Sequence, residues 1–397
     1  MSANNDAVVE EMIPLSVPNI AGNEWHYIKD CLETGWVSSV GSYVTAFEKA
    51  IAEFTGTKYA VACMNGTSAI HLALQLSGVK RDDYVIVPNI TFVASCNAIH
   101  YIGADPLLID VDPDTWQMDL DLLEEFLESN TYEKNGERYF VKDHRRIGAI
   151  LPVHVLGNMC DMDRLIMLGE KYNLVIVEDS TEALGSYYKQ KHAGTFGKFG
   201  TLSFNGNKII TTGGGGMIMT NDPELAKHAK HLTTQAKADN FEYRHDEIGY
   251  NYRLVNLLAA MGVAQMEQLP GFLARKKEID SRYRAALENE GLAFQKIGEH
   301  INPNCWLQTM KVADQPGMIK HLLEHQVQCR PFWVPMNQLP MFSNCPFISH
   351  RNVSDLVYKS CISIPSSTNL TDDQVSRVIS VIKSGNQMTK NVLYGAD

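Results

Sequence analysis

The chain has 397 residues, 45% hydrophobic and 20% charged, and its 46 acidic residues outnumber 35 Lys and Arg, giving a formal net charge of −11 at pH 7. This composition is that of an ordinary globular protein and excludes an intrinsically disordered chain, which lacks the apolar residues that offset ordering entropy. The acidic balance argues against general nucleic-acid binding, which needs Lys and Arg to neutralise phosphates. Single cores stop growing at about 250–300 residues, so we expect two subdomains.

No stretch of about 18 apolar residues is present, so the sequence predicts no membrane-spanning helix. The first residues are polar and acidic, unlike the basic and apolar segments of a signal peptide. The eight cysteines are scattered and none forms a C-x-x-C pair. We therefore expect reduced thiols, no metal site and a cytoplasmic location.

The first two thirds of the chain alternate short apolar runs with helical patterns. Strands are predicted at residues 59–64, 83–87, 106–111, 147–153 and 174–177, and helices at 68–76, 119–129 and 161–171. Strand–helix alternation of this kind predicts a mostly parallel sheet covered by helices on both faces.

Beyond about Gly249 the pattern changes. Two helices are predicted at 254–267 and 273–288, separated near Pro270, and a smaller α+β region follows. A last helix is predicted at 371–383, because Thr371 and Gln374 form a capping box and Gly385 follows. We therefore divide the chain into a large domain, 13–255, and a small C-terminal domain, 256–397, with linking helices at 254–288.

Four segments carry residues that a packed core does not require, and the first, Asn65-Gly66-Thr67-Ser68, lies between a predicted strand and a predicted helix. Gly66 lets the backbone approach a ligand closely, and the helix N-terminus offers free N–H groups and a positive dipole end. This arrangement binds phosphate, although a plain strand–helix turn with a Ser or Thr cap gives the same pattern.

The second and fourth segments are an acidic strand end and an aromatic cluster. Asp179 follows an apolar strand at its carboxyl end, where open α/β sheets bind ligands, and a surface cap is the alternative. The cluster at 249–253 reads GYNYR and precedes a predicted helix, so an ordinary helix start is its alternative explanation.

The third segment runs from Gly194 to Gly216 and contains Lys208, with Ser203 before it and four glycines after it. It does not match a nucleotide-binding P-loop, because Ile209 follows the lysine. The other interpretation is a lysine that forms a Schiff base with a carbonyl. Partial burial and nearby positive charge lower the pKa of a lysine and permit that chemistry.

In order and spacing, these segments resemble the DegT-type sugar aminotransferases, which belong to the fold-type I pyridoxal-phosphate (PLP) enzymes. The similar pieces are IPL at 13–15, GWVS at 35–38, NGTSA at 65–69, PNITFVASCNAI at 88–99, LPVHVLGN at 151–158, VEDSTEALGS at 177–186, the stretch 194–222, GYNYRL at 249–254 and CRPFWVP at 329–335. The resemblance implies an α/β fold-type I PLP-transferase, with a mostly parallel seven-stranded sheet between helices in the large domain and a smaller C-terminal α+β domain.

The resemblance also implies roles for individual residues. Lys208 takes the place of the lysine that binds PLP as an imine and then moves protons, and Asp179 that of the carboxylate paired with the pyridine nitrogen. Phe92 matches the aromatic residue that stacks on the ring. Asn251 matches a residue that reaches the phosphate from the neighbouring subunit, which implies a homodimer with shared active sites. The remaining cofactor-binding positions are matched by Gly66, Thr67, Ser68 and Ser203.

Some positions depart from the common pattern. Glu182 stands where a glutamine is usual near the phenolic oxygen of the cofactor, so we expect it to carry a proton or to turn toward substrate. The residues after Arg253, and Asn337 in place of a histidine, concern substrate contacts more than the cofactor site. His154, Arg253 and Arg330 are candidates for binding substrate, and a structural role is the alternative for each.

The implied reaction is a ping-pong transfer of the amino group of L-glutamate to a nucleotide-linked keto sugar. Lys208 argues against a dehydratase branch of the family, which has histidine there. The segments DSTEALGS and TTQAK look most like the branch that aminates the C4 keto group of UDP-2-acetamido-4-keto-2,6-dideoxyhexose, on the routes to bacillosamine and legionaminic acid. The alternatives are GDP-4-keto-6-deoxymannose, a dTDP-3- or 4-keto sugar, a simple amino-acid substrate, or a non-catalytic PLP-binding regulator.

Overall fold

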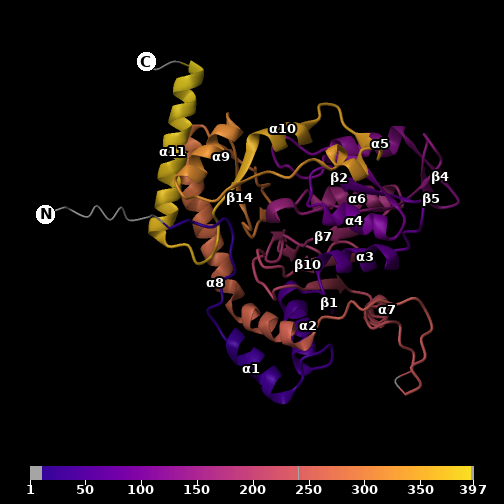
Figure 1. Cartoon of the computed structure of the whole chain (residues 1–397). Helices are drawn as coiled ribbons and strands as arrows, with labels where there is room; N and C mark the ends of the chain where they lie inside the picture. The colour runs from indigo at the N-terminus through magenta and orange to yellow at the C-terminus, as the bar shows by residue number, and fades with distance from the viewer. Residues whose placement is uncertain (1–10, 240, 395–397) are drawn as a thin grey trace.

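The structure is a computed structural model that describes residues 11–239 and 241–394. A large sheet flanked by helices lies on one side of the long helix α8 (Asn256–Leu287), and a smaller sheet packs around the other end of that helix (Figure 1). We call these two parts the large body and the small body.

The large sheet has ten strands, where we expected seven. Its path runs β1 (Tyr59–Cys63), β11 (Gly216–Thr220), β10 (Phe199–Ser203), β7 (Val175–Asp179), β6 (Arg146–Ile150), β2 (Tyr84–Pro88), β3 (Asp105–Ile109) and β16 (Phe347–Ile348), with the hairpin β4 (Thr131–Lys134) and β5 (Glu137–Phe140) attached to β6. β11 is antiparallel to both neighbours, and the strands from β10 to β16 along the path are parallel. The three extra strands are β16, of two residues, and the polar β4–β5 pair, which have no apolar run to predict them.

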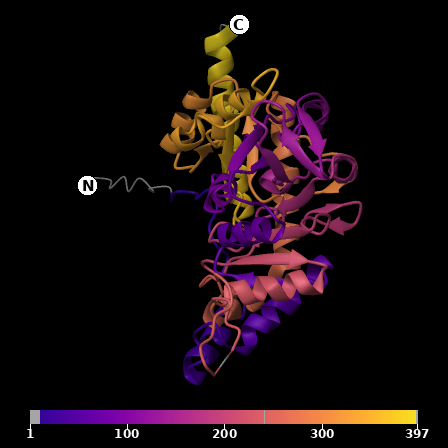
Figure 2. The same ribbon diagram turned by 90° about the vertical axis from the view of Figure 1, so that its right-hand side faces the viewer.

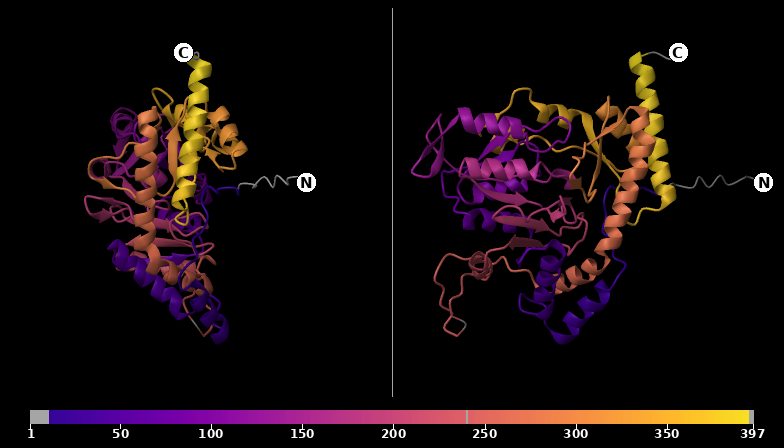
Figure 3. Two further views of the ribbon diagram at one scale, coloured as in Figure 1. Left: turned by 90° about the vertical axis from the view of Figure 1, so that its left-hand side faces the viewer. Right: turned by 180° about the vertical axis from the view of Figure 1, so that it is seen from behind.

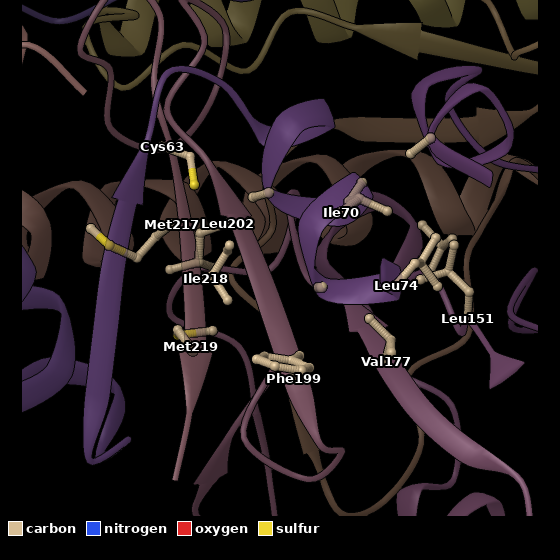
Figure 4. Close-up of a cluster of buried hydrophobic side chains, with 14 of the residues drawn as sticks. Cys63, Ile70, Leu74, Leu151, Val177, Phe199, Leu202, Met217, Ile218 and Met219 are labelled. Carbon is tan, nitrogen blue, oxygen red and sulfur yellow. The ribbon is translucent and has the colours of Figure 1, made fainter. Parts of the chain in front are cut away.

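All five strands predicted from apolar runs are confirmed. Strands buried on both faces read as continuous apolar runs, and all five residues of β2 are buried. Figure 4 shows how Ile70 and Leu74 of α3 (Gly66–Leu76) gather with Val177 and Phe199 of the neighbouring strands β7 and β10. The core of the large body therefore lies between this sheet and the helices that cover it.

The helices predicted for this region are also confirmed. α5 (Leu120–Ser129) and α6 (Met162–Lys171) each begin after an aspartate, Asp119 or Asp161, whose side chain accepts backbone N–H groups of the first turn. Further helices are α1 (Glu24–Thr34), α2 (Ser42–Thr55), α4 (Ala94–Tyr101), α7 (Pro223–Thr233) and α10 (Val353–Ser360). α2 and α7 pack at the β1 end of the sheet (Figure 2).

The prediction of two linking helices was wrong, because α8 continues through Pro270 as one helix of 32 residues. Proline lacks an N–H and normally kinks or ends a helix. Here the first half packs on α1 and α2, and the second half buries Ile279 and Tyr283 in the small body. Packing on both sides of Pro270 holds the helix together, and Figure 3 shows that it bends on its way between the two bodies.

The small body contains an antiparallel sheet in the order β12 (Ala293–Phe294), β14 (Gln308–Lys311), β17 (Cys361–Ile364) and β15 (Arg330–Pro331), with helices α9 (Gln315–Glu324) and α11 (Asp372–Tyr394). The capping box of α11 is confirmed, since Thr371 and Gln374 exchange side chain–backbone hydrogen bonds of 2.9 and 3.1 Å. The predicted end of this helix before Gly385 is wrong, because α11 continues through Gly385 to Tyr394. Gly385 lets α9 approach, because a Cβ there would lie 2.7 Å from His321 Cδ2.

One segment on each side of the predicted boundary at 255 packs with the other body. Ile13 forms a bridge with Val327 and is buried in the core of the small body, whereas β16 from the C-terminal third extends the large sheet. A further small sheet joins β13 (Ile301–Asn302), β8 (Tyr187–Tyr188) and β9 (Lys191–His192), and so links the two bodies.

The eight cysteines are all free thiols. Among the residues that the structure describes, no helix is both long and apolar enough to cross a membrane.

Candidate active site

A cavity of about 570 Å3 opens beside the carboxyl ends of β1 and β10, between the large and small bodies. We call it the cleft. The large body contributes Asn65, Gly66, Thr67, Phe92, Thr181, Glu182, Ser203 and Lys208 to its lining, and the small body contributes Trp306, Arg330, Trp333 and Ser363. The sheet therefore brings together residues that lie far apart in the sequence, at the edge where α/β folds bind ligands.

Lys208 projects into the cleft from the loop after β10. Its amine nitrogen lies 3.8 Å from Oε1 of Glu182 and 4.0 Å from the centre of the Trp306 ring. Burial lowers the pKa of the amine, although the carboxylates of Glu182 and Asp179 oppose this shift. A larger fraction of the amine is therefore unprotonated and nucleophilic than for a lysine in water.

Asp179 is the last residue of β7 and is buried. One carboxylate oxygen accepts the hydroxyl of Ser95 at 2.6 Å, and the other accepts the backbone N–H of Thr181 at 3.1 Å. These bonds fix the plane of the carboxylate and leave further lone pairs for a cationic ring nitrogen. The structure thus explains how Asp179 is oriented, and it adds Ser95, which we did not predict.

The start of α3 forms an anion-binding corner of the cleft. Asn65 caps the helix by accepting the N–H of Ser68 at 2.8 Å. Gly66 is required because a Cβ there would lie only 2.9 Å from that of Ser203, so the two segments could not approach. Thr67 and Ser203 reach the cleft, whereas the side chain of Ser68 is buried in the first helical turn and does not line it. The free N–H groups at this helix end suit a phosphate.

Phe92 stands at the cleft with 55% of its surface exposed, and its ring meets that of Trp333 edge to face at 6.4 Å. Its exposed face is available to a planar ring, as the resemblance predicts.

Glu182 is buried at the base of the cleft. Its Oε2 accepts the N–H of Leu156 at 2.8 Å, and Leu156 adopts the left-handed backbone conformation (φ +61°) that presents this N–H. Burial raises the pKa of Glu182 to about 7, although the charge of Lys208 opposes the shift. A carboxyl group of raised pKa can donate to a phenolate when it is protonated and accept from a phenol when it is ionised.

Two of the three substrate candidates do not line the cleft. His154 is fully buried and pairs with Glu178 at 3.0 Å, and Glu178 also accepts the backbone N–H groups of Gly194, Phe196 and Gly197. Arg253 is buried in an ion pair with Glu48. These contacts give both residues structural roles.

Arg330 does line the cleft, and it donates to the carbonyl of Cys329 at 3.1 Å. The two atypical segments have structural explanations: Asn337 exchanges two hydrogen bonds with Asn89, and Asn256 binds the backbone of Tyr43 and Trp36. Neither Asn337 nor Asn256 lines the cleft.

Asn251 is exposed and lies outside the cleft of its own chain, in a backbone bridge with Thr234. A contact with the cleft of a second chain stays a prediction. Trp306, Trp333 and the asparagines at 205 and 207 line the cleft without having been predicted, because no local motif marks them as ligand-binding residues.

Together these groups fit PLP: an oriented buried carboxylate, a lysine of lowered pKa, an anion-binding helix end and an exposed aromatic face. Comparison with known proteins agrees. Residues 18–383 match the profile of the DegT/DnrJ/EryC1/StrS aminotransferase family. A putative pyridoxal phosphate-dependent aminotransferase of Bacillus subtilis (strain 168), EpsN, is 38% identical over 381 residues, which cover 94% of this chain and 96% of EpsN.

Two further proteins extend this comparison. The GDP-perosamine synthase of Escherichia coli O157:H7 is 38% identical over 366 residues, covering 91% of this chain and 95% of that enzyme. The PLP form of the putative sugar aminotransferase Spr1654 from Streptococcus pneumoniae superimposes with a TM-score of 0.84 at 26% identity, covering 95% of this chain and 99% of that one. The chain therefore belongs to the DegT/DnrJ/EryC1/StrS aminotransferase family and is a PLP-dependent sugar aminotransferase.

Proposed function

We propose that this enzyme transfers the amino group of L-glutamate to the C4 keto group of a nucleotide-linked 4-keto-6-deoxyhexose, with GDP-4-keto-6-deoxymannose as the first candidate. The support for this sugar is the relative named GDP-perosamine synthase, which matches nearly the whole chain. The sequence motifs alone had favoured a UDP-linked sugar, and the comparisons give better support to the GDP-linked alternative.

The observation that carries the transamination chemistry is the Lys208 amine, which lies in the cleft and has a lowered pKa. When bound, PLP supplies the electron sink that makes a carbon–hydrogen bond next to nitrogen acidic. The free Lys208 amine then takes the proton from Cα of glutamate in the first half-reaction and delivers a proton to C4 of the sugar in the second. Asp179 holds the ring nitrogen in its cationic form, and the start of α3 with Ser203 holds the phosphate.

Arg330 supplies the cleft with its second cationic side chain, after Lys208. The guanidinium group suits a carboxylate or a diphosphate equally, because both present paired oxygens. We propose that it anchors glutamate in one half-reaction and the sugar diphosphate in the other. In a ping-pong cycle the two substrates occupy the same cleft one after the other, so one cationic group has to bind each of them in turn.

A UDP-2-acetamido-4-keto-2,6-dideoxyhexose is the second candidate. The segments DSTEALGS and TTQAK favour it, and Glu182 of the first segment lies in the cleft itself. The replacement of a neutral amide by a titratable carboxyl group is the departure from the common family pattern that lies in the cleft, since Asn337 and Asn256 do not line it.

A homodimer with shared active sites is also part of the proposal. Residues 237–239 and 241–249 project far from the large body (Figure 3), and three large side chains of this loop are strongly exposed: Phe241 by 92%, Tyr243 by 74% and Ile248 by 83%. Apolar groups gathered on a projecting loop are typical of an interaction surface. The loop leads directly to Asn251, so docking on a second chain would bring Asn251 close to that chain.

The test begins with the PLP-loaded protein and L-glutamate. We expect the visible band of the bound cofactor to bleach and 2-oxoglutarate to form, with L-alanine as the matched donor control. Each candidate sugar is then added separately, and the amino sugar is identified by mass spectrometry. A higher kcat/KM for the GDP-linked sugar supports the first candidate, and a higher value for the UDP-linked sugar replaces it with the second. Lys208→Ala must give no product with either sugar.

A further inference from the structure

Trp306 comes from the small body and covers the reactive amine of the large body. It is 2% exposed, its ring centre lies 4.0 Å from the Lys208 amine, and its indole N–H donates to the carbonyl of Asn207 at 2.7 Å. Asn207 is the residue directly before Lys208. One side chain therefore contacts both the amine of Lys208 and the loop that carries it.

We propose that Trp306 is a catalytic residue, which stabilises the Lys208 amine in its protonated form and fixes its position during proton transfer, while Asn304 and Lys276 act as positioning residues for Trp306. The proposal rests on the role of Lys208 in the proposed function and is independent of the identity of the sugar.

The chemical need arises from the proton that the amine carries between two carbons. The amine of Lys208 accepts the proton on its lone pair and becomes an ammonium group. It then releases the same proton at the second carbon, so the neutral amine is regenerated. Burial disfavours the ammonium form. The negative face of an indole ring attracts a cation, and removal of a desolvated contact of this kind changes a proton equilibrium by about tenfold.

Asn304 ties Trp306 to the turn that carries Glu182. This fully buried amide donates to the carbonyls of Glu182 at 2.8 Å and Leu184 at 2.9 Å, and it accepts the backbone N–H of Trp306 at 3.0 Å. Gly157 makes room for it, because a Cβ there would lie 1.8 Å from the Asn304 oxygen and its φ is +81°. One side chain thus holds the backbones of both Glu182 and Trp306, whose side chains contact the Lys208 amine.

Lys276 is a second residue that holds the backbone of Trp306. It lies within α8, is 3% exposed, and donates to the carbonyls of Trp306 and Ser366 and to the hydroxyl of Ser366. All three acceptors are neutral oxygens. Burial lowers the pKa of the Lys276 amine to about 7, and its hydrogen bonds order the backbone around Trp306.

The first experiment measures the Lys208 amine without the cofactor. PLP-free protein is reductively methylated with formaldehyde at a series of pH values, and modification of Lys208 is followed by mass spectrometry. We expect the midpoint of the pH profile to fall by about one unit in Trp306→Leu, and by less in Trp306→Phe, which keeps a ring. The midpoint is the readout because a more open cleft also raises the absolute rate. Trp116→Phe is the matched control, since Trp116 is a buried tryptophan outside the cleft.

The second experiment measures the glutamate half-reaction of the PLP-loaded variants in a single turnover. Trp306→Leu should be slowed by about tenfold or more, with a change in PLP affinity of less than about threefold, and Lys276→Met should show a smaller effect of the same kind. An unchanged pH midpoint and half-reaction rate in a folded Trp306→Leu protein would overturn the proposal. If wild-type protein does not react with glutamate, the proposed function fails, and the methylation profile still decides the role of Trp306. If Lys276→Met does not fold, Asn304→Ala tests positioning instead.

Discussion

Among single residues, Glu182 has a charge that depends strongly on its surroundings, because burial raises its pKa. The unfolded carboxyl group titrates near 4.5 and the buried one near about 7, so the folded protein binds this proton more tightly. The resulting stabilisation is complete below pH 4.5 and is lost as the pH rises through 7. The stability of the PLP-free protein is therefore expected to fall as the pH rises through this range.

The prediction concerns the free energy of unfolding of wild type and Glu182→Gln, measured with urea at pH 5 and pH 8. Between these values wild type should lose about 3 kcal/mol relative to the variant, because only wild type releases this buried proton. Glu33→Gln, at an exposed position on α1, should behave as wild type does. Parallel pH profiles for wild type and Glu182→Gln would contradict a shifted carboxyl group.

Variants of Asp179 and Ser95 separate the effect of the carboxylate charge from the effect of its orientation. Asp179→Asn removes the charge that pairs with the ring nitrogen, so we expect the glutamate half-reaction to slow by about a hundredfold or more. Ser95→Ala keeps the carboxylate and removes only the hydrogen bond of 2.6 Å, so its loss should be about tenfold at most. Stopped-flow absorbance measures both rates. A larger loss in Ser95→Ala would show that orientation outweighs charge.

The residues found from sequence and those missed differ in a physical way. Asp179 and Gly66 lie at the ends of strands that local sequence predicts, and the family resemblance adds Lys208 and Phe92. Trp306 reaches the cleft only because Asn304 and Lys276 hold distant segments together, and no local pattern reports such contacts. His154 and Arg253 do not line the cleft, and their contacts with Glu178 and Glu48 are recognised only in three dimensions.

At the scale of elements, the cap of α3 serves both folding and binding. Asn65→Ala removes the acceptor for Ser68 N–H and should cost about 1 kcal/mol in unfolding free energy. It should also weaken PLP binding, because the helix end faces the cleft. Asp119→Ala removes the equivalent cap of α5 and should cost a similar amount with no change in PLP affinity. Denaturant titration and PLP fluorescence separate the two effects, and an equal loss of affinity in both variants would contradict a local role for α3.

Element boundaries were predicted well where a cap or an apolar run decides them, and badly where packing decides them. The capping box at Thr371 correctly placed the start of α11. Pro270 and Gly385 were taken as helix breaks, but both lie inside helices, since contacts with neighbouring helices outweigh their weak local propensity.

For the whole molecule, the shared-site dimer makes a sharp prediction. Lys208→Ala and Asn251→Ala chains, each inactive or nearly so alone, should regain activity when mixed, because one of the two sites in a heterodimer has both residues intact. Purified heterodimer should reach about half of wild-type activity. Mixing Lys208→Ala with Asp179→Asn is the control, since both changes affect residues of the same chain's site and no intact site results. Activity restored equally in both mixtures would argue against shared sites.

The pairing of Ile13 with the small body and of β16 with the large sheet has a consequence for folding during synthesis. During synthesis, the edge of β3 that pairs with β16 stays unpaired until β16 emerges from the ribosome, more than two hundred residues later. Ile13 likewise waits for Val327. An uncovered strand edge invites pairing with other chains. A nascent chain that stalls after residue 255 is thus exposed to aggregation. The edge of β3 is covered only when nearly all of the protein has been translated.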